Sequence, residues 1–181
     1  MKFHNYKLPF SHYIIEDVFP PHLLIQIESF FENTNISKPY THKKFRYGED
    51  IRVLPEVYKY IVDNKNKFFS ICKEELLIKR NINDNPSEYH IFDGKLCLDT
   101  NGYTIERHTD TLCKAITIVI YLNNEGSTTT LHDSLNGNIC YNIPKIKNTA
   151  LMFVPEDNVT WHSVERTFQN RHTIQLTFKK N

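Results

Sequence analysis

The sequence lacks a long hydrophobic run and a paired-cysteine motif. Residues 1–19, MKFHNYKLPFSHYIIEDVF, interrupt every apolar stretch with a charged or polar residue or a proline, so we expect neither a signal peptide nor a membrane span there. The four cysteines form no CxxC pair, which argues against a zinc cluster and against a disulfide scaffold. We therefore expect a cytoplasmic protein with reduced thiols.

An excess of charge of one sign is also missing. Lysine and arginine number 22 against 21 aspartate and glutamate residues, which leaves a formal net charge of +1. The long-range electrostatic field is then weak and attracts no polyanion. We expect neither nucleic acid nor a membrane among the partners. With 181 residues, no internal repeat and no low-complexity tract, the chain fits one domain spanning residues 1–181.

The first half of that domain, residues 1–88, is predicted to be a helical support. Pro20 and Pro21 suit the start of a helix, and apolar residues follow them at helical spacing. A second helical region begins at Pro55. Between the two, residues 33–50 show neither helical nor strand periodicity and are rich in polar and cationic side chains. This pattern indicates a long loop, which is a candidate lid.

The second half, residues 89–181, is predicted to be the β core. Short β-rich runs such as KLCLD, AITIVIYLN, TALMFV and HTIQLTF alternate with turn residues. Residues 123–126 and 136–137 indicate two hairpins. Many short, evenly spaced strands favour a jelly roll with Greek-key connections, and the helices should lie against one of its sheets. The expected fold class is therefore α+β.

Two histidines and an aspartate form a candidate metal site. His108 and Asp110 are two residues apart at the end of a predicted strand, so their side chains leave the same face and can converge on one ion. His162 lies in a separate predicted strand, VTWHSV. Two imidazoles and one carboxylate that share one face of an octahedron leave the other positions open, an arrangement that non-haem Fe(II) enzymes use. The pattern predicts an iron site that is open to chemistry.

An arginine stands nine residues beyond the second histidine. The intervening ERTFQN favours a hairpin, so we expect Arg171 to begin a strand that pairs with the strand of His162, about 5 Å away. A guanidinium binds a carboxylate through two parallel charge-assisted hydrogen bonds, and the hydroxyl of Thr173 on the same face can add a third donor. The arrangement predicts a carboxylate ligand beside the metal.

Several landmarks spread over almost the whole chain carry a family resemblance: HYIIEDVFPPHLL, NGYTIERHTD, ITIVIYLN, IPKIKNTALMFVP, VTWHSVE and RHT. In these segments the sequence resembles the Fe(II)/2-oxoglutarate oxygenases, nearest their prolyl 4-hydroxylase-like branch. The resemblance implies a double-stranded β-helix, a cupin-like jelly roll, with N-terminal helices packed on its major sheet. It also implies iron at His108, Asp110 and His162, and 2-oxoglutarate at Arg171 and Thr173.

One position departs from the pattern of that branch. A tyrosine that binds the co-substrate often stands three residues before the glycine that is Gly102 here, and this chain has Asp99 instead. Tyr103 and Tyr121 are the candidates to replace that contact. The resemblance implies Fe(II) as the metal and 2-oxoglutarate and O2 as co-substrates, and it allows ascorbate as an accessory reductant.

The implied reaction is hydroxylation of an unactivated C–H bond, with 2-oxoglutarate converted to succinate and carbon dioxide. A peptidyl residue, a free amino acid or a small metabolite is the expected substrate. Asp110 disfavours halogenation, because related halogenases lack that carboxylate. Thr177 stands six residues after Arg171, where nucleic-acid demethylases of this family carry a second arginine, and so weakens that alternative. An alternative of another class is a non-catalytic jelly roll that binds a metal or a sugar.

Overall fold

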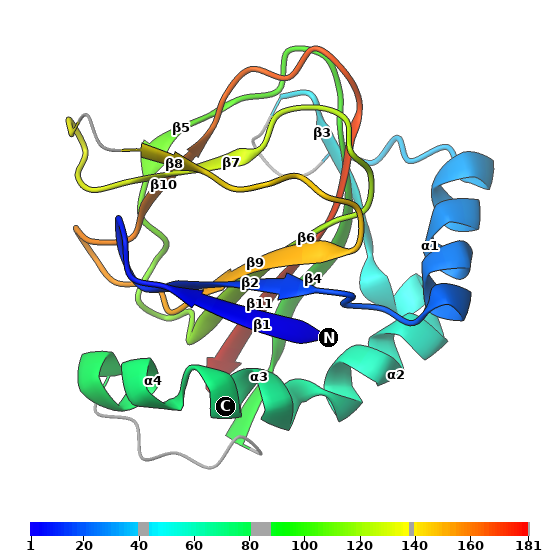
Figure 1. The fold of residues 1–181 in the computed structure, drawn as a ribbon. Helices are drawn as coiled ribbons and strands as arrows, with labels where there is room; N and C mark the ends of the chain where they lie inside the picture. The colour runs from blue at the N-terminus through cyan, green and yellow to red at the C-terminus, as the bar shows by residue number, and fades with distance from the viewer. Residues whose placement is uncertain (40–43, 81–87, 138–139, 181) are drawn as a thin grey trace.

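The protein folds as two antiparallel sheets that face each other, with helices outside the larger sheet (Figure 1). The structure is a computed structural model that describes residues 1–39, 44–80, 88–137 and 140–180. The larger sheet has seven strands, in the order β1 (Lys2–Tyr6), β2 (His12–Glu16), β9 (Thr149–Phe153), β6 (Ile116–Tyr121), β11 (Arg171–Lys180), β4 (Tyr89–Asp99) and β3 (Arg46–Asp50). The smaller sheet has four strands, in the order β5 (Ile105–His108), β10 (Trp161–Val164), β7 (Thr129–His132) and β8 (Cys140–Asn142). The helical elements are α1 (Pro21–Asn33), η1 (Ile51–Val53), α2 (Pro55–Asp63), α3 (Lys65–Ile71) and α4 (Lys73–Arg80).

The main hydrophobic core joins side chains of the helices to one face of the larger sheet. Ile118 of β6 and Phe178 of β11 belong to this core, and Phe69 of α3 meets Phe178 edge-on with ring centroids 5.6 Å apart. Because side chains alternate along a strand, Val119 projects from the other face of β6. It belongs to a second, smaller apolar cluster between the two sheets. Because one face of β6 packs on the helices and the other faces the smaller sheet, every residue of β6 is buried.

Strand β11 divides its side chains in the same way. Ile174 and Leu176 belong to the core on the helical side. Arg171, Thr173 and Gln175 alternate with them and face the space between the sheets. Burying polar side chains on the inner face of a strand costs free energy unless they form hydrogen bonds. Such a row of polar groups is therefore typical of a binding site.

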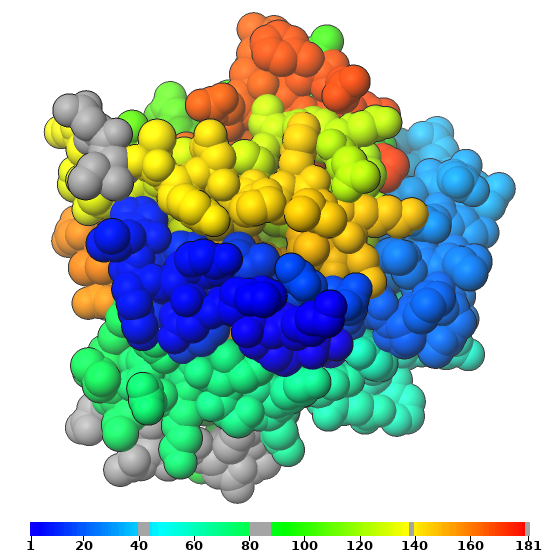
Figure 2. Space-filling view, in the orientation of Figure 1, coloured from blue at the N-terminus to red at the C-terminus, as the bar shows by residue number. Residues whose placement is uncertain are grey.

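The N-terminal strands close one edge of the larger sheet. β1 and β2 pair in register from Lys2 opposite Glu16 to Tyr6 opposite His12, and β2 continues the sheet by pairing with β9. Figure 2 shows this blue segment on the surface between the green helical segment and the yellow chain that leads into β9. Within the described residues, no helix is long and apolar enough to cross a bilayer.

Residues 1–88 contain the predicted helices and also three strands, β1, β2 and β3. The predicted lid loop over residues 33–50 was wrong at its end. Residues 46–50 form β3, which pairs with β4 at the edge of the larger sheet. This pairing is a contact between distant segments, so the local periodicity of an edge strand does not reveal it. Residues 40–43 of the predicted loop lie outside the described residues.

Two predicted connections were wrong as well. Residues 123–126 do not make a hairpin, because β6 belongs to the larger sheet and β7 to the smaller one. For the same reason the strand of His162 does not pair with the strand of Arg171: β10 pairs with β5 and β7, whereas β11 pairs with β4 and β6. Turn residues indicate where a chain reverses and do not indicate which sheet it enters next. The connection near residues 136–137 does join paired strands, since β7 pairs with β8.

Candidate active site

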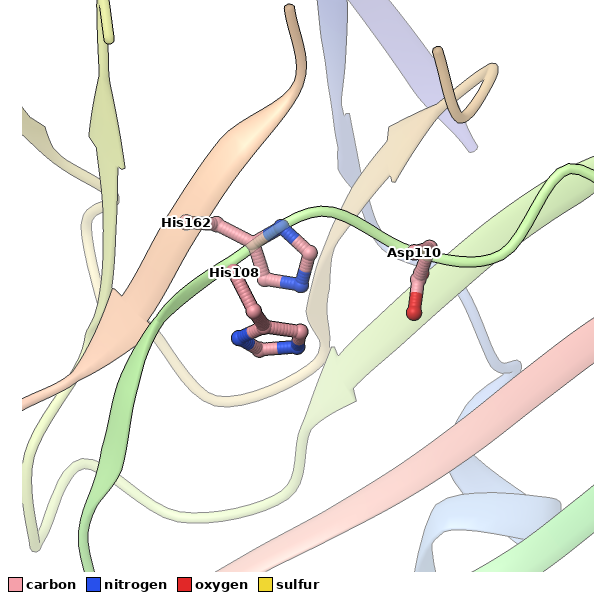
Figure 3. Close-up of side chains that lie close together, drawn as sticks. All are labelled: His108, Asp110 and His162. Carbon is pink, nitrogen blue, oxygen red and sulfur yellow. The ribbon is translucent and has the colours of Figure 1, made fainter. Parts of the chain in front are cut away.

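Strands β5 and β10 of the smaller sheet, together with the residues directly after β5, bring three potential metal ligands close to one another. His108 ends β5 and lies opposite His162 of β10 in the strand pairing, with ring centroids 4.2 Å apart. Asp110 follows two residues after His108. The ligand atoms of the three side chains all lie within 4.8 Å of one another. Figure 3 shows each imidazole with one nitrogen turned toward the Asp110 side chain.

Both imidazoles are held in the tautomer that a metal requires. The Nδ1 atom of His108 lies 2.9 Å from the carbonyl oxygen of Glu106, and that of His162 lies 2.9 Å from the carbonyl oxygen of Thr160. A carbonyl can only accept a hydrogen bond, so each Nδ1 carries a proton, and Nε2 is the nitrogen left to bind a metal. Such backbone contacts orient metal-binding histidines in general.

The ionisation states also suit a metal. Burial, together with the nearby ring of His108, lowers the pKa of His162 to about 4, so its imidazole is neutral near pH 7. Burial opposes ionisation of Asp110, but the ammonium of Lys114, which donates to Oδ1 at 2.5 Å, and the hydroxyl of Thr117, which donates to Oδ2 at 2.7 Å, hold its pKa below the ordinary value. His162 and Asp110 are therefore in their ligand forms, and a metal ion would compete with Lys114 for Oδ1.

A cavity of about 110 Å³ joins these three side chains to Arg171. Arg171 enters it from the larger sheet, whereas the two histidines enter from the smaller sheet. His162 and Arg171 were predicted to lie on neighbouring strands. In the structure they lie on different sheets and approach each other across the space between those sheets. The cavity is also lined by apolar and polar residues of both sheets and of the segment before β6: Ile105, Val119, Phe153, Val164, Leu176, Asp93, Lys114, Thr117, Thr129, Gln175 and Thr177.

Donors at the Arg171 side of the cavity fit a carboxylate. Arg171 is 1% exposed; its Nη1 donates to Asp99 at 2.7 Å, and its Nη2 donates to Thr129 at 3.3 Å. Among the described residues, Nε of Arg171 and the fully buried Oγ1 of Thr173 have no hydrogen-bond partner. Buried polar atoms without partners are uncommon, and the one on Arg171, which lines the cavity, indicates a ligand or water that would satisfy it. Thr173 follows on the same face of β11 but is not among the described residues that line the cavity. Together with the imidazole and carboxylate donor set, the unpartnered donor of Arg171 fits a metal with a chelating carboxylate co-substrate.

The two tyrosines predicted to contact the co-substrate lie near Arg46 and Thr129 and do not line the cavity. Neither Tyr103 nor Tyr121 is among the described residues that line it. The hydroxyl of Tyr121 accepts a hydrogen bond from the backbone N–H of Thr129 at 3.3 Å. Tyr103 is fully buried with its ring 4.3 Å from the guanidinium carbon of Arg46. These tyrosines support the side chains around Arg171, and their direct contact with a co-substrate stays a prediction.

Sequence reasoning missed several residues around the cavity. Lys114 and Thr117 donate hydrogen bonds to the carboxylate of Asp110, and Gln175 lines the same cavity. Strand alternation could have found Gln175, which is two residues beyond Thr173 on the same face. Lys114 lies in the connection before β6, where sequence carries no periodic signal.

No protein-family model matches the sequence, and no curated protein matches it significantly. Solved structures do match. A prolyl hydroxylase from Trichoplax adhaerens, in complex with a hypoxia-inducible factor peptide fragment, aligns over 93% of this chain and 83% of its own with a TM-score of 0.63 and 17% identity. A viral collagen prolyl hydroxylase from Paramecium bursaria Chlorella virus-1, in its 2-oxoglutarate complex, aligns over 94% and 96% with a TM-score of 0.66 and 15% identity.

A third match is HygX from Streptomyces hygroscopicus with nickel, 2-oxoglutarate and hygromycin B bound. It aligns over 94% of this chain and 83% of its own, with a TM-score of 0.62 and 9% identity. The chain has the fold of the 2-oxoglutarate and iron(II) oxygenases. The predicted jelly roll is thereby confirmed. At these identities the likeness concerns the fold, and the chemistry must be argued from the residues of the site.

Proposed function

We propose that this protein is an Fe(II)- and 2-oxoglutarate-dependent dioxygenase that hydroxylates an unactivated C–H bond. The observation that carries the proposal is the meeting of His108, Asp110 and His162, with ligand atoms within 4.8 Å, in a cavity that Arg171 also lines. A metal site alone would need no buried arginine with an unpartnered donor beside it. The arginine favours a dioxygenase over the alternative of a non-catalytic jelly roll that binds a metal or a sugar.

In this proposal each side chain has a defined task. His108, Asp110 and His162 hold the iron, and the guanidinium of Arg171 with the hydroxyl of Thr173 receives the far carboxylate of 2-oxoglutarate. When bound, iron would activate O2. One oxygen atom would then be inserted into the C–H bond, and 2-oxoglutarate would be converted to succinate and carbon dioxide. Phe153 and other apolar residues form part of the cavity wall beside these groups.

The substrate we propose is a peptidyl residue, a free amino acid or a small metabolite. The structural neighbours support both kinds, since one was solved with a peptide fragment and another with hygromycin B. Thr177 lines the cavity where nucleic-acid demethylases are expected to carry an arginine, which speaks against that substrate. We propose a single domain over residues 1–181. A cytoplasmic location and a role for ascorbate stay predictions.

The proposal is tested by co-substrate binding and then by turnover. Fe(II) and 2-oxoglutarate added to the protein without oxygen should give a weak visible charge-transfer band. Oxygen with a panel of peptides and amino acids should then yield succinate above the uncoupled background. His162→Ala should abolish both signals, and His22→Ala, which removes an exposed histidine of α1, should leave both unchanged.

Two results would contradict the proposed function. One is a protein that binds Fe(II) but gives no band and no succinate with any member of the panel, which would favour the non-catalytic alternative. The other is a band and turnover that survive His162→Ala, which would show that the metal is held elsewhere.

A further inference from the structure

Three charged side chains lie side by side on neighbouring strands behind the cavity. Arg46 of β3 is opposite Asp99 of β4, and Asp99 is opposite Arg171 of β11. All three side chains are buried, with at most 1% of their surface exposed. Arg171 lines the cavity, whereas Arg46 and Asp99 are not among the described residues that do.

The carboxylate at the centre of this cluster is shared unequally. Arg46 binds both of its oxygens, from Nε to Oδ1 at 2.5 Å and from Nη2 to Oδ2 at 2.7 Å. Arg171 donates to Oδ2 only, from Nη1 at 2.7 Å. Two-point binding of this kind is the stronger form of the arginine–carboxylate contact. The ring of Tyr103 lies 4.3 Å from the guanidinium carbon of Arg46 and fixes the plane of that group.

The charges of the three groups add up to one net positive charge, from two guanidiniums and one carboxylate. An isolated pair of Asp99 and Arg171 would be neutral, and a carboxylate that entered the cavity would meet Arg171 with its charge already balanced. Electrostatic interactions are strong at a buried site, so this balance decides whether an anion is attracted. By engaging both oxygens of Asp99, Arg46 compensates its negative charge and leaves the charge of Arg171 available.

We infer that Arg46 and Asp99 are positioning residues for the co-substrate arginine: Asp99 holds Arg171 in place, and Arg46 offsets the charge of Asp99 so that Arg171 binds a carboxylate. The inference rests on the proposed function, since it assigns the carboxylate to 2-oxoglutarate. It also accounts for the aspartate at a position where a tyrosine is often found, because Asp99 serves the arginine and does not touch the co-substrate.

The test measures binding of 2-oxoglutarate by calorimetry to the Fe(II)-loaded protein without oxygen. Arg46→Met should raise the dissociation constant by at least about fivefold, the lower end of typical couplings between sites. It should leave the affinity of the three ligand residues for Fe(II) unchanged, which a general loss of structure would not do. Arg52→Met is the matched control, because it removes an exposed arginine of the neighbouring η1 and should leave 2-oxoglutarate binding unchanged.

A charge-balanced variant separates electrostatics from packing. Arg46→Met combined with Asp99→Asn restores the net charge of +1 on the cluster, so it should recover most of the affinity that Arg46→Met loses. Arg46→Lys, which keeps the charge, should also bind 2-oxoglutarate more tightly than Arg46→Met. If Arg46→Met alone does not fold, both variants are compared with the wild type, and each should bind 2-oxoglutarate less than about fivefold more weakly than the wild type. A double variant as weak as Arg46→Met overturns the inference, and so, where Arg46→Met does not fold, does a double variant at least about fivefold weaker than the wild type.

Different results would contradict the role of Arg46 and the proposed dioxygenase function. Wild-type binding that Arg46→Met leaves unchanged overturns the role of Arg46 and leaves the proposed dioxygenase standing. A wild-type protein that takes up Fe(II) but no 2-oxoglutarate overturns the proposed function and this inference with it.

Discussion

The stability of the metal-free protein should depend more on Asp99 than on Arg171 beside it. The Asp99 side chain is 0% exposed and accepts three hydrogen bonds from the guanidiniums of Arg46 and Arg171. Asp99→Asn keeps the shape but removes the charge, so two buried guanidiniums are left without their counter-ion. Removing one partner from a buried ion pair costs about 3–5 kcal/mol, a large part of the stability of about 5–15 kcal/mol that is usual for a domain.

Removal of Arg171 should cost less. Arg171→Met eliminates the hydrogen bond to Asp99 at 2.7 Å and the longer one to Thr129 at 3.3 Å, and it leaves the two-point contact from Arg46 to Asp99 in place. The remaining pair is neutral, so no uncompensated charge is buried. We expect a loss of about 1.5–3 kcal/mol, the range for a hydrogen bond to a charged group.

Urea unfolding of the metal-free variants measures both losses, provided that the slope of each transition matches the wild type. Asp63→Asn is the control, because that carboxylate is 55% exposed and its surface ion pair with Lys59 should contribute under about 1 kcal/mol. The reasoning is refuted if Arg171→Met destabilises as much as Asp99→Asn, or if Asp99→Asn costs no more than the control.

Two further predictions concern supports outside the site. Tyr13 and Ser11 donate to Glu75 at 2.6 and 2.8 Å, and although burial opposes ionisation, these bonds lower the pKa of Glu75. Its stabilising effect is then present above its ordinary pKa of 4.5 and is lost as the pH falls through the lower folded value. In urea unfolding, Glu75→Gln should be less stable than wild type at neutral pH and equal to it in acid; a constant difference would contradict this. Asn148 has φ 64° and exchanges two hydrogen bonds with the backbone of Phe19, at 2.8 and 2.9 Å. Asn148→Gly suits that φ but loses both bonds, so a net loss of about 1 kcal/mol is expected in thermal unfolding, and a gain would count against it.

The parts of the site that sequence reasoning anticipated are those defined by short-range geometry. His108 and Asp110 leave one face because they are two apart beside a strand, and Thr173 shares the face of Arg171 for the same reason. Asp99 was recognised as unusual, but its role was not. Its two partners lie 53 and 72 residues away along the chain, and neither separation produces a local pattern.

Three features can be predicted from the amino-acid sequence: the alternation within each strand, the residue types that can bind iron and a carboxylate, and the mostly-β character of the second half. These depend on side-chain chemistry and on the two-residue repeat of a strand. The three-dimensional fold was needed to show which sheet each strand joins, and therefore that Arg171 approaches His162 across the interior and not along a hairpin. It also showed that Arg46, within a predicted loop, lies beside Asp99. Strand pairing is a contact between distant segments, chosen by the burial of whole sheet faces, and no local stretch of sequence contains that information.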